Sequence, residues 1–245
     1  MDLAKSGGVL LFYGTAADNA AALPAVAQTA DGLLAWLGAP PRFAVVLIWR
    51  DDPRTIAPRA WPSKATVNGG FTSPGATEIA IYRAEEWDRV LLHEMIHALH
   101  WDWPDMPHTP LPCWGLGPRA ITFPHLFEAW TELYAEWLWT TWHRIPWDRQ
   151  VAHMRSQAVE VLARHRRRGG DWKEDTNVFA YYVLKVAIEP LLPHLWVSGG
   201  PRTAEEREAI LCTAVSPVLE ELRAAATTAR PSTGPFSMRM TVADA

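Results

Sequence analysis

The chain has 245 residues, of which 49% are hydrophobic and 20% charged, and its net charge is -4. This is the composition of a globular protein rather than a disordered one, and the small negative charge gives no general attraction to nucleic acid. The length allows one or two domains with a sizeable core. Two cysteines, Cys113 and Cys212, are too few for a disulfide framework, so we expect buried thiols, with a single bridge as the alternative.

Residues 9–13 form an apolar patch near the N-terminus. Five residues are too few to span a membrane, and the preceding segment has no strong basic region because Lys5 is offset by Asp2. We therefore expect a cytoplasmic protein with no membrane partner and no nucleic-acid partner.

The segment that follows predicts one helix and then three strands. Residues 18–37 are rich in alanine and leucine and run into a Gly-Ala-Pro-Pro segment, which is typical of a helix and its end. The uninterrupted apolar run 43–49 predicts a buried strand. Residues 65–72 and 77–83 predict two more strands, joined by a Ser-Pro-Gly turn.

Residues 87–101 contain no glycine or proline and predict a helix that carries the motif HExxH. His93 and His97 are four residues apart, so they lie on one helix face, where each can bind one Zn²⁺ at about 2.0–2.1 Å. Glu94 lies beside that face, where it can hold a metal-bound water and accept its proton. The motif predicts a zinc-dependent hydrolase; a chance match on an amphipathic helix is the alternative.

The second of the three predicted strands is a candidate for substrate binding. In zincins the sheet lies beside the metal helix, and an edge strand pairs with the substrate backbone. Residues 67–72 contain Gly69 and Gly70, which allow a close backbone approach. We expect Asn68 and Gly69 to bind substrate; an ordinary hairpin is the alternative.

The second half of the chain is predicted to be helical after a proline-rich stretch. One of its helices ends in an arginine-rich run followed by two glycines, which is a normal stop signal; a nuclear-localisation or nucleic-acid patch is the alternative. Residues 229–245 are rich in Thr, Ser, Pro and Ala and are expected to form a loose tail. The predicted helices cover residues 125–142, 147–168, 176–188 and 203–226.

A catalytic zinc ion needs a third protein ligand and an open position for water. Glu128, Glu132 and Glu136 recur at four-residue spacing and therefore share one helix face. Carboxylates stacked among aromatic residues are costly unless they bind a metal or a partner. A solvated acidic stripe is the alternative, and His100 and Asp102 are weaker candidates for the third ligand.

HExxH followed by a helix with Glu-x-x-x-Glu resembles the gluzincin clan of metallopeptidases. Residues 131–137, TELYAEW, are similar to the second-helix motif of its aminopeptidase branch but lack the asparagine and glycine of that motif. The resemblance implies Glu132 as third zinc ligand and Glu136 as the acid that orients a ligating histidine. Glu128 as ligand, with Glu132 behind it, is the alternative. The VNGGFT stretch with the IYRAEEW–HExxH run is faintly similar to predicted metallopeptidases of large DNA viruses.

The predicted function is zinc-dependent hydrolysis of peptide bonds in a peptide or protein substrate, with Glu94 as general base and one Zn²⁺. In gluzincins a tyrosine or histidine after the zinc helices donates to the oxyanion. Tyr181, Tyr182 and His194 are the candidates, and Tyr181 is the best of them because it shares a polar stripe with Asn177 and Lys185; a purely structural tyrosine is the alternative. The rival function is a catalytically silent helical interaction protein with a structural or vestigial metal site.

The expected fold is α+β and zincin-like, with a small mixed sheet and the active-site helix in the N-terminal half and a helical C-terminal half. Residues 1–103 would form the upper subdomain with the sheet and the HExxH helix. Residues 104–228 would form the helical subdomain that carries the third ligand, and 229–245 the tail.

Overall fold

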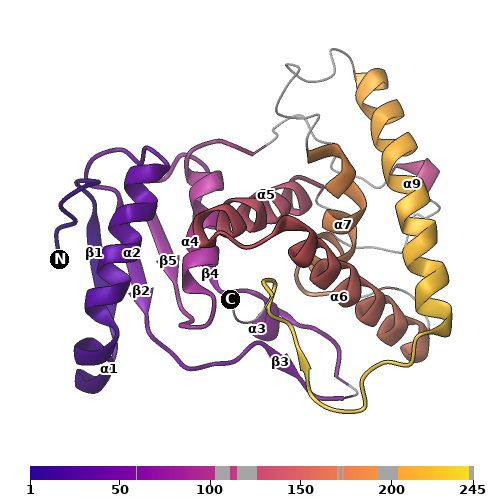
Figure 1. Ribbon diagram of the computed structural model, residues 1–245, viewed down its shortest axis with the longest axis horizontal. Coiled ribbons are helices and arrows are strands. Elements are labelled where there is room, and N and C mark those ends of the chain that lie inside the picture. The colour runs from indigo at the N-terminus through magenta and orange to yellow at the C-terminus, as the bar shows by residue number, and fades with distance from the viewer. Residues whose placement is uncertain are drawn as a thin grey trace. The chain divides into compact units, whose positions relative to one another are not determined.

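The protein is a mixed α/β chain with a small mixed sheet (Figure 1). It divides into two compact units: a sheet unit, Met1–Arg54 with Asn68–Asp102, and a helical unit, made of the described residues of Thr55–Val67 and Trp103–Ala245. The computed structural model describes residues 1–58, 60–102, 111–114, 126–169, 172, 174–192 and 204–242.

A four-stranded sheet runs through the sheet unit. Its order is β1 (Val9–Tyr13), β2 (Ala44–Ile48), β5 (Glu78–Ile81) and β4 (Gly70–Phe71). The first three strands are parallel to one another, and β4 is antiparallel to β5. The short strand β4 is therefore an edge of the sheet, and it lies beside a strand that leads directly into the HExxH helix.

Two helices, α2 (Leu23–Trp36) and α4 (Trp87–Ala98), contact this sheet and each other. Alternate strand residues, such as Val45 and Leu47, are fully buried, as the pleat of a strand with one apolar face requires. On α4, every residue from 89 to 98 is buried. The HExxH motif is therefore carried by a helix packed into the core of its unit.

The predicted strand 43–49 and helix 87–101 are confirmed as β2 and α4. The predicted helix 18–37 is instead two helices, α1 (Ala16–Ala21) and α2. The chain breaks at Ala22 because Pro24 has no backbone N–H and fits only the first turn of a new helix.

The segment around residue 67 also differs from the prediction. Residues 65–72 were expected to form one strand, but Lys64–Val67 form the short helix α3, and only Gly70–Phe71 are extended as β4. The apolar patch 9–13 is strand β1. Five residues carry too little periodicity to reveal a strand that is specified by pairing with β2.

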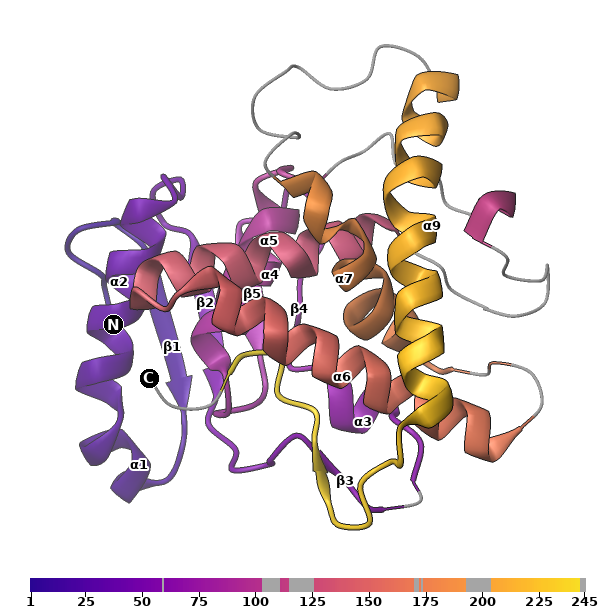
Figure 2. The same ribbon diagram turned by 45° about the vertical axis from the view of Figure 1, so that its right-hand side comes forward.

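The helical unit is built on α5 (Leu126–His143) and α6 (Trp147–Arg168), with α9 (Ala204–Thr228) in contact with α6 (Figure 2). Between α6 and α9 the chain forms a π-helical turn, η2 (Ala180–Leu184), which continues into α7 (Lys185–Ile188) and a 3₁₀ turn, η3 (Glu189–Leu191). The structure also contains a 3₁₀ turn, η1 (Pro112–Trp114), and a two-stranded antiparallel ribbon of β3 (Thr55–Ile56) and β6 (Phe236–Ser237).

The expectation of a loose C-terminal tail is wrong for residues 229–242. Met238 and Met240 are buried. Their carbonyl oxygens accept hydrogen bonds of 2.7 Å from the Tyr182 hydroxyl and from Gln150 Nε2, respectively. The polar composition of the segment hid these contacts, because its order comes from partners that are distant in sequence.

The expectation of two free thiols is also wrong. Cys113 in η1 and Cys212 in α9 form a disulfide across 99 residues of sequence, with their Cα atoms 5.7 Å apart. Among the described residues, no helix has the length and apolar character needed to cross a membrane.

Candidate functional site

His93 and His97 occupy adjacent turns of α4, as the four-residue spacing predicts. Their Nε2 atoms lie 3.1 Å apart, and their ring planes meet at 75°. Two ligands of a tetrahedral zinc ion with bonds of about 2.05 Å are expected to lie about 3.3 Å apart. Both imidazoles are therefore arranged so that their Nε2 lone pairs can converge on one metal ion.

Asp102 fixes the ring of His97. The Nδ1 atom of His97 lies 2.9 Å and 3.0 Å from the two carboxylate oxygens of Asp102. With the proton on Nδ1, Nε2 keeps its lone pair for a ligand, which is what a carboxylate does behind a metal-binding histidine. The sequence offered Asp102 only as a weak candidate ligand and missed this role.

The chain reaches this position through a tight reversal at the end of α4. His100 has a φ of 55°, and its N–H donates to the His97 carbonyl, while Trp101 N–H donates to the Ile96 carbonyl. This is the Schellman pattern, with a histidine where glycine is usual. The reversal returns Asp102 to the last turn of the helix. In the sequence, an acid that follows a helix stop signal after His97 could have indicated the contact between Asp102 and His97.

Glu94, the predicted base, is buried on α4 next to the edge strand. A Cβ atom placed on Gly70 would lie 3.3 Å from Glu94 Cγ, 2.7 Å from Val90 Cγ1 and 2.9 Å from the Ala80 carbonyl oxygen. Only glycine fits this approach without a shift of its neighbours. The backbone of β4 therefore passes directly beside the predicted base.

Asn68 and Gly69, which are predicted to bind substrate, directly precede β4. A Cβ atom on Gly69 would lie 2.4 Å from Arg54 Nη2 and 2.8 Å from Val90 Cγ2, so a larger residue there would require these side chains to shift. Its carbonyl oxygen accepts from the Tyr82 N–H at 2.9 Å, and the Asn68 carbonyl oxygen accepts from Arg83 Nη2 at 3.4 Å. Substrate binding by Asn68 and Gly69 stays a prediction.

The glutamates at 128, 132 and 136 share one face of α5, but their surroundings within the helical unit differ. Glu136 and Glu132 are buried and face the ammonium of Lys185, in direct contact with Glu136 and 4.0 Å from Glu132 Oε1. Glu136 Oε2 also accepts from Gln150 Nε2 at 2.9 Å. Burial raises the pKa of Glu136 above its ordinary value, and Lys185 opposes that shift.

Lys185 is the cation that sequence reasoning missed. It lies 49 residues after Glu136, so no spacing rule within one helix connects the two. The sequence did contain a signal for this ion pair: a helix with the Glu-x-x-x-Glu pattern is followed by a helix whose polar stripe contains one lysine.

Glu128 stands apart from this buried group. It is half-buried and accepts a hydrogen bond of 3.1 Å from the Tyr181 hydroxyl. Tyr181 belongs to the π-helical turn η2, a local widening that often occurs at functional sites. The helical unit thus pairs the predicted oxyanion donor with the most accessible of the three carboxylates.

Comparisons with protein-family models, with curated proteins and with solved structures give no match. Function is therefore inferred from the residues and from the geometry within each unit.

Proposed function

We propose that the chain is a zincin-like, zinc-dependent peptidase of gluzincin type, in which His93, His97 and Glu128 hold one Zn²⁺. The observation that carries the proposal is the histidine pair of α4. Its Nε2 atoms are 3.1 Å apart, and the Asp102 carboxylate beside His97 Nδ1 favours the tautomer that leaves Nε2 to a metal ion. Two nitrogens and one carboxylate oxygen form a donor set that suits zinc.

Glu128 is our choice of third ligand, in place of the Glu132 that the gluzincin resemblance implies. Lys185 contacts Glu136 directly and lies 4.0 Å from Glu132 Oε1 in the interior of the helical unit. Turning Glu132 toward a metal ion would move a buried carboxylate away from the ammonium that it now faces. Glu128 is half-buried, and binding a metal would not disrupt that group.

Glu94 is the proposed general base, accepting a proton from the attacking water and delivering it to the leaving amine. A zinc ion held by these residues would polarise the scissile carbonyl and would lower the pKa of its bound water toward 7. Among the described residues β4 is an edge of the sheet beside Glu94, and its outer side would pair with an extended peptide. Tyr181 is the proposed donor to the oxyanion; its single hydroxyl hydrogen, which is donated to Glu128 in this structure, would turn to the oxyanion during the reaction.

Metal content and ligand identity are tested first, on the full chain. We expect about one zinc per chain in the wild type and loss of zinc in His93→Ala. Glu128→Gln and Glu132→Gln each remove one negative charge from the same helix face, so each variant is a control for the other. Our assignment predicts at least about tenfold weaker zinc binding in Glu128→Gln only. The absence of stoichiometric metal in the wild type would overturn the proposal. A loss of zinc affinity in Glu132→Gln alone would show that Glu132, and not Glu128, is the third ligand.

Catalysis is tested by cleavage of a peptide library. Glu94→Gln should retain zinc and lose about 10²-fold or more of the activity. Equal activity in the wild type and in Glu94→Gln would exclude Glu94 as the base. Zinc binding without cleavage of any peptide would favour the alternative, a silent interaction protein with a structural metal.

A further inference from the structure

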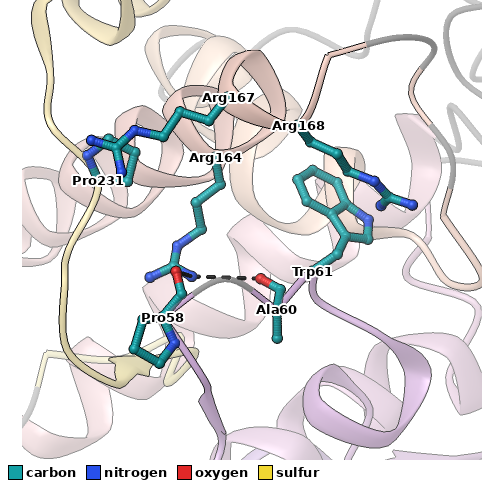
Figure 3. A pocket seen from close by; sticks show the side chains of 7 residues that line it. All are labelled: Pro58, Ala60, Trp61, Arg164, Arg167, Arg168 and Pro231. Atoms are coloured by element: carbon teal, nitrogen blue, oxygen red, sulfur yellow. Dashed lines mark hydrogen bonds between the residues drawn. The ribbon is translucent and has the colours of Figure 1, made fainter.

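The helical unit has a pocket of about 320 Å³ at the C-terminal end of α6 (Figure 3). Three arginines of the last turns of α6, Arg164, Arg167 and Arg168, line it together with Trp61 and two prolines. From the sequence, this arginine run was a helix stop signal. The pocket shows that three of its cations gather around one space, which a stop signal does not require.

Arg164 is the buried member of the group, with 6% of its surface exposed. Its Nε donates to Glu160 Oε1 at 2.7 Å, and its Nη1 donates to the carbonyl oxygens of Ala57 and Pro58 at 3.2 Å and 3.1 Å. Its Nη2 is buried and has no acceptor among the described residues. A buried guanidinium N–H without an acceptor is costly, so an acceptor that enters the pocket would be favoured.

Trp61 supplies a second donor of the same kind. Its Nε1 is buried and likewise finds no acceptor in the described part of the chain. The ring is fixed by an edge-on contact with Trp172, with centroids 4.9 Å apart, and by the Arg168 guanidinium 5.7 Å from its centroid. Figure 3 shows Arg168 on the Trp61 side of the pocket and Arg167 on the Pro231 side.

The charge at the pocket indicates the valence of the ligand. The three arginines carry three positive charges, and Glu160, which also accepts from the Ser232 N–H, cancels one. The partial negative charge of the α6 C-terminus, about half a charge, offsets only part of the rest. Arg166 is directed elsewhere, toward the carbonyl oxygens of Thr227 and Ala229. Over the described residues an excess of between one and two positive charges remains, which suits a dianion better than a carboxylate.

We propose that this pocket binds a phosphate group that carries close to two negative charges, as free phosphate or as a phosphate monoester. Its oxygens would accept from Arg164 Nη2, from Trp61 Nε1 and from the guanidinium groups of Arg167 and Arg168, and phosphate has the several acceptor oxygens that this number of donors requires. This inference is independent of the metal site on α4.

The test is a calorimetric titration of the full chain with inorganic phosphate at constant ionic strength, above the second pKa of phosphate. Arg167→Gln/Arg168→Gln should weaken binding at least about tenfold. Arg144→Gln/Arg149→Gln removes two exposed charges of the same unit and should leave the affinity unchanged. Trp61→Phe keeps an aromatic ring, removes the N–H and should weaken binding several-fold. Circular dichroism verifies that each variant is folded.

Phenyl phosphate is titrated in parallel to separate the two sources of the group. Tighter binding of phenyl phosphate would identify a monoester as the ligand, and tighter binding of inorganic phosphate would identify the free ion. Absence of binding by both probes would overturn the proposal. An equal loss of affinity in the two double variants would also overturn it, because it would show general attraction between charges.

Discussion

At the residue scale, the arrangement of the α4 histidines depends on one acid placed five residues after His97. Within a helix, that spacing points two side chains in different directions. The left-handed conformation of His100 ends the helix and turns the chain back, so the Asp102 carboxylate meets His97 Nδ1. A backbone feature of one residue therefore decides which nitrogen of a histidine is available for a metal.

Replacing Asp102 with asparagine tests this role. The amide would keep the shape of the side chain but offer only one neutral acceptor, so His97 would be held less firmly. We expect Asp102→Asn to weaken zinc binding about 10- to 100-fold, as measured by competition with a chromogenic chelator. Asp51→Asn, at an exposed position of the same unit, should have no effect. Unchanged zinc affinity in Asp102→Asn would show that the contact does not support the metal ligand.

At the element scale, polar contacts of Tyr181 and Lys185 join the π-helical turn and α7 to α5. Tyr181 reaches Glu128 near the start of α5, and Lys185 reaches Glu132 and Glu136 further along it. Since both donors lie on one continuous helical stretch, that stretch positions the acidic face of α5 as a unit. Because Tyr181 and Lys185 contact them, three carboxylates can line one face of a helix that is otherwise flanked by aromatic residues.

Lys185→Met removes the only charged side chain in the sequence of residues 180–188 and leaves two buried carboxylates facing an apolar side chain. We expect a loss of about 3–5 kcal/mol in the free energy of unfolding, measured by urea denaturation. Lys64→Met, at an exposed lysine of the same unit, should change it little. The double variant Lys185→Met/Glu136→Gln should recover part of the loss. A small effect of Lys185→Met would show that the carboxylates are stabilised in another way.

At the scale of the whole molecule, the Cys113–Cys212 disulfide connects the η1 turn to α9 across a long stretch of sequence. Its main effect is to restrict the unfolded chain, because the bridge joins residues that are 99 positions apart. Structural disulfides are typical of oxidising compartments. The bridge therefore counts against the cytoplasmic location that the sequence led us to expect.

Cys113→Ser/Cys212→Ser should lower the free energy of unfolding by up to about 4–5 kcal/mol. Cys113 is exposed and Cys212 half-buried, so the serines themselves should cost little in packing. Urea denaturation with and without a reducing agent measures the effect. The reduced wild type should match the double variant, and the reducing agent should leave the double variant unchanged. A wild type that is equally stable in both conditions would show that the bridge contributes nothing.

The sequence by itself determined the elements whose signal is local. An arginine-rich run followed by glycine predicted the end of α6 at residue 168, and an uninterrupted apolar run predicted β2. The HExxH spacing predicted that His93 and His97 share a helix face, and the structure places their Nε2 atoms 3.1 Å apart. These features follow from the period of a helix or strand, which neighbouring residues encode.

Only the tertiary structure decided which residues meet across long stretches of sequence. Lys185 with Glu136, Cys113 with Cys212, and the tail at Met240 with Gln150 are separated by 49, 99 and 90 residues. No local period reports such contacts, because they depend on how packed elements bring distant segments together. The arginine run at the end of α6 shows the same limit: its composition indicates a helix stop, and only packing against Trp61 and Pro58 makes it a pocket.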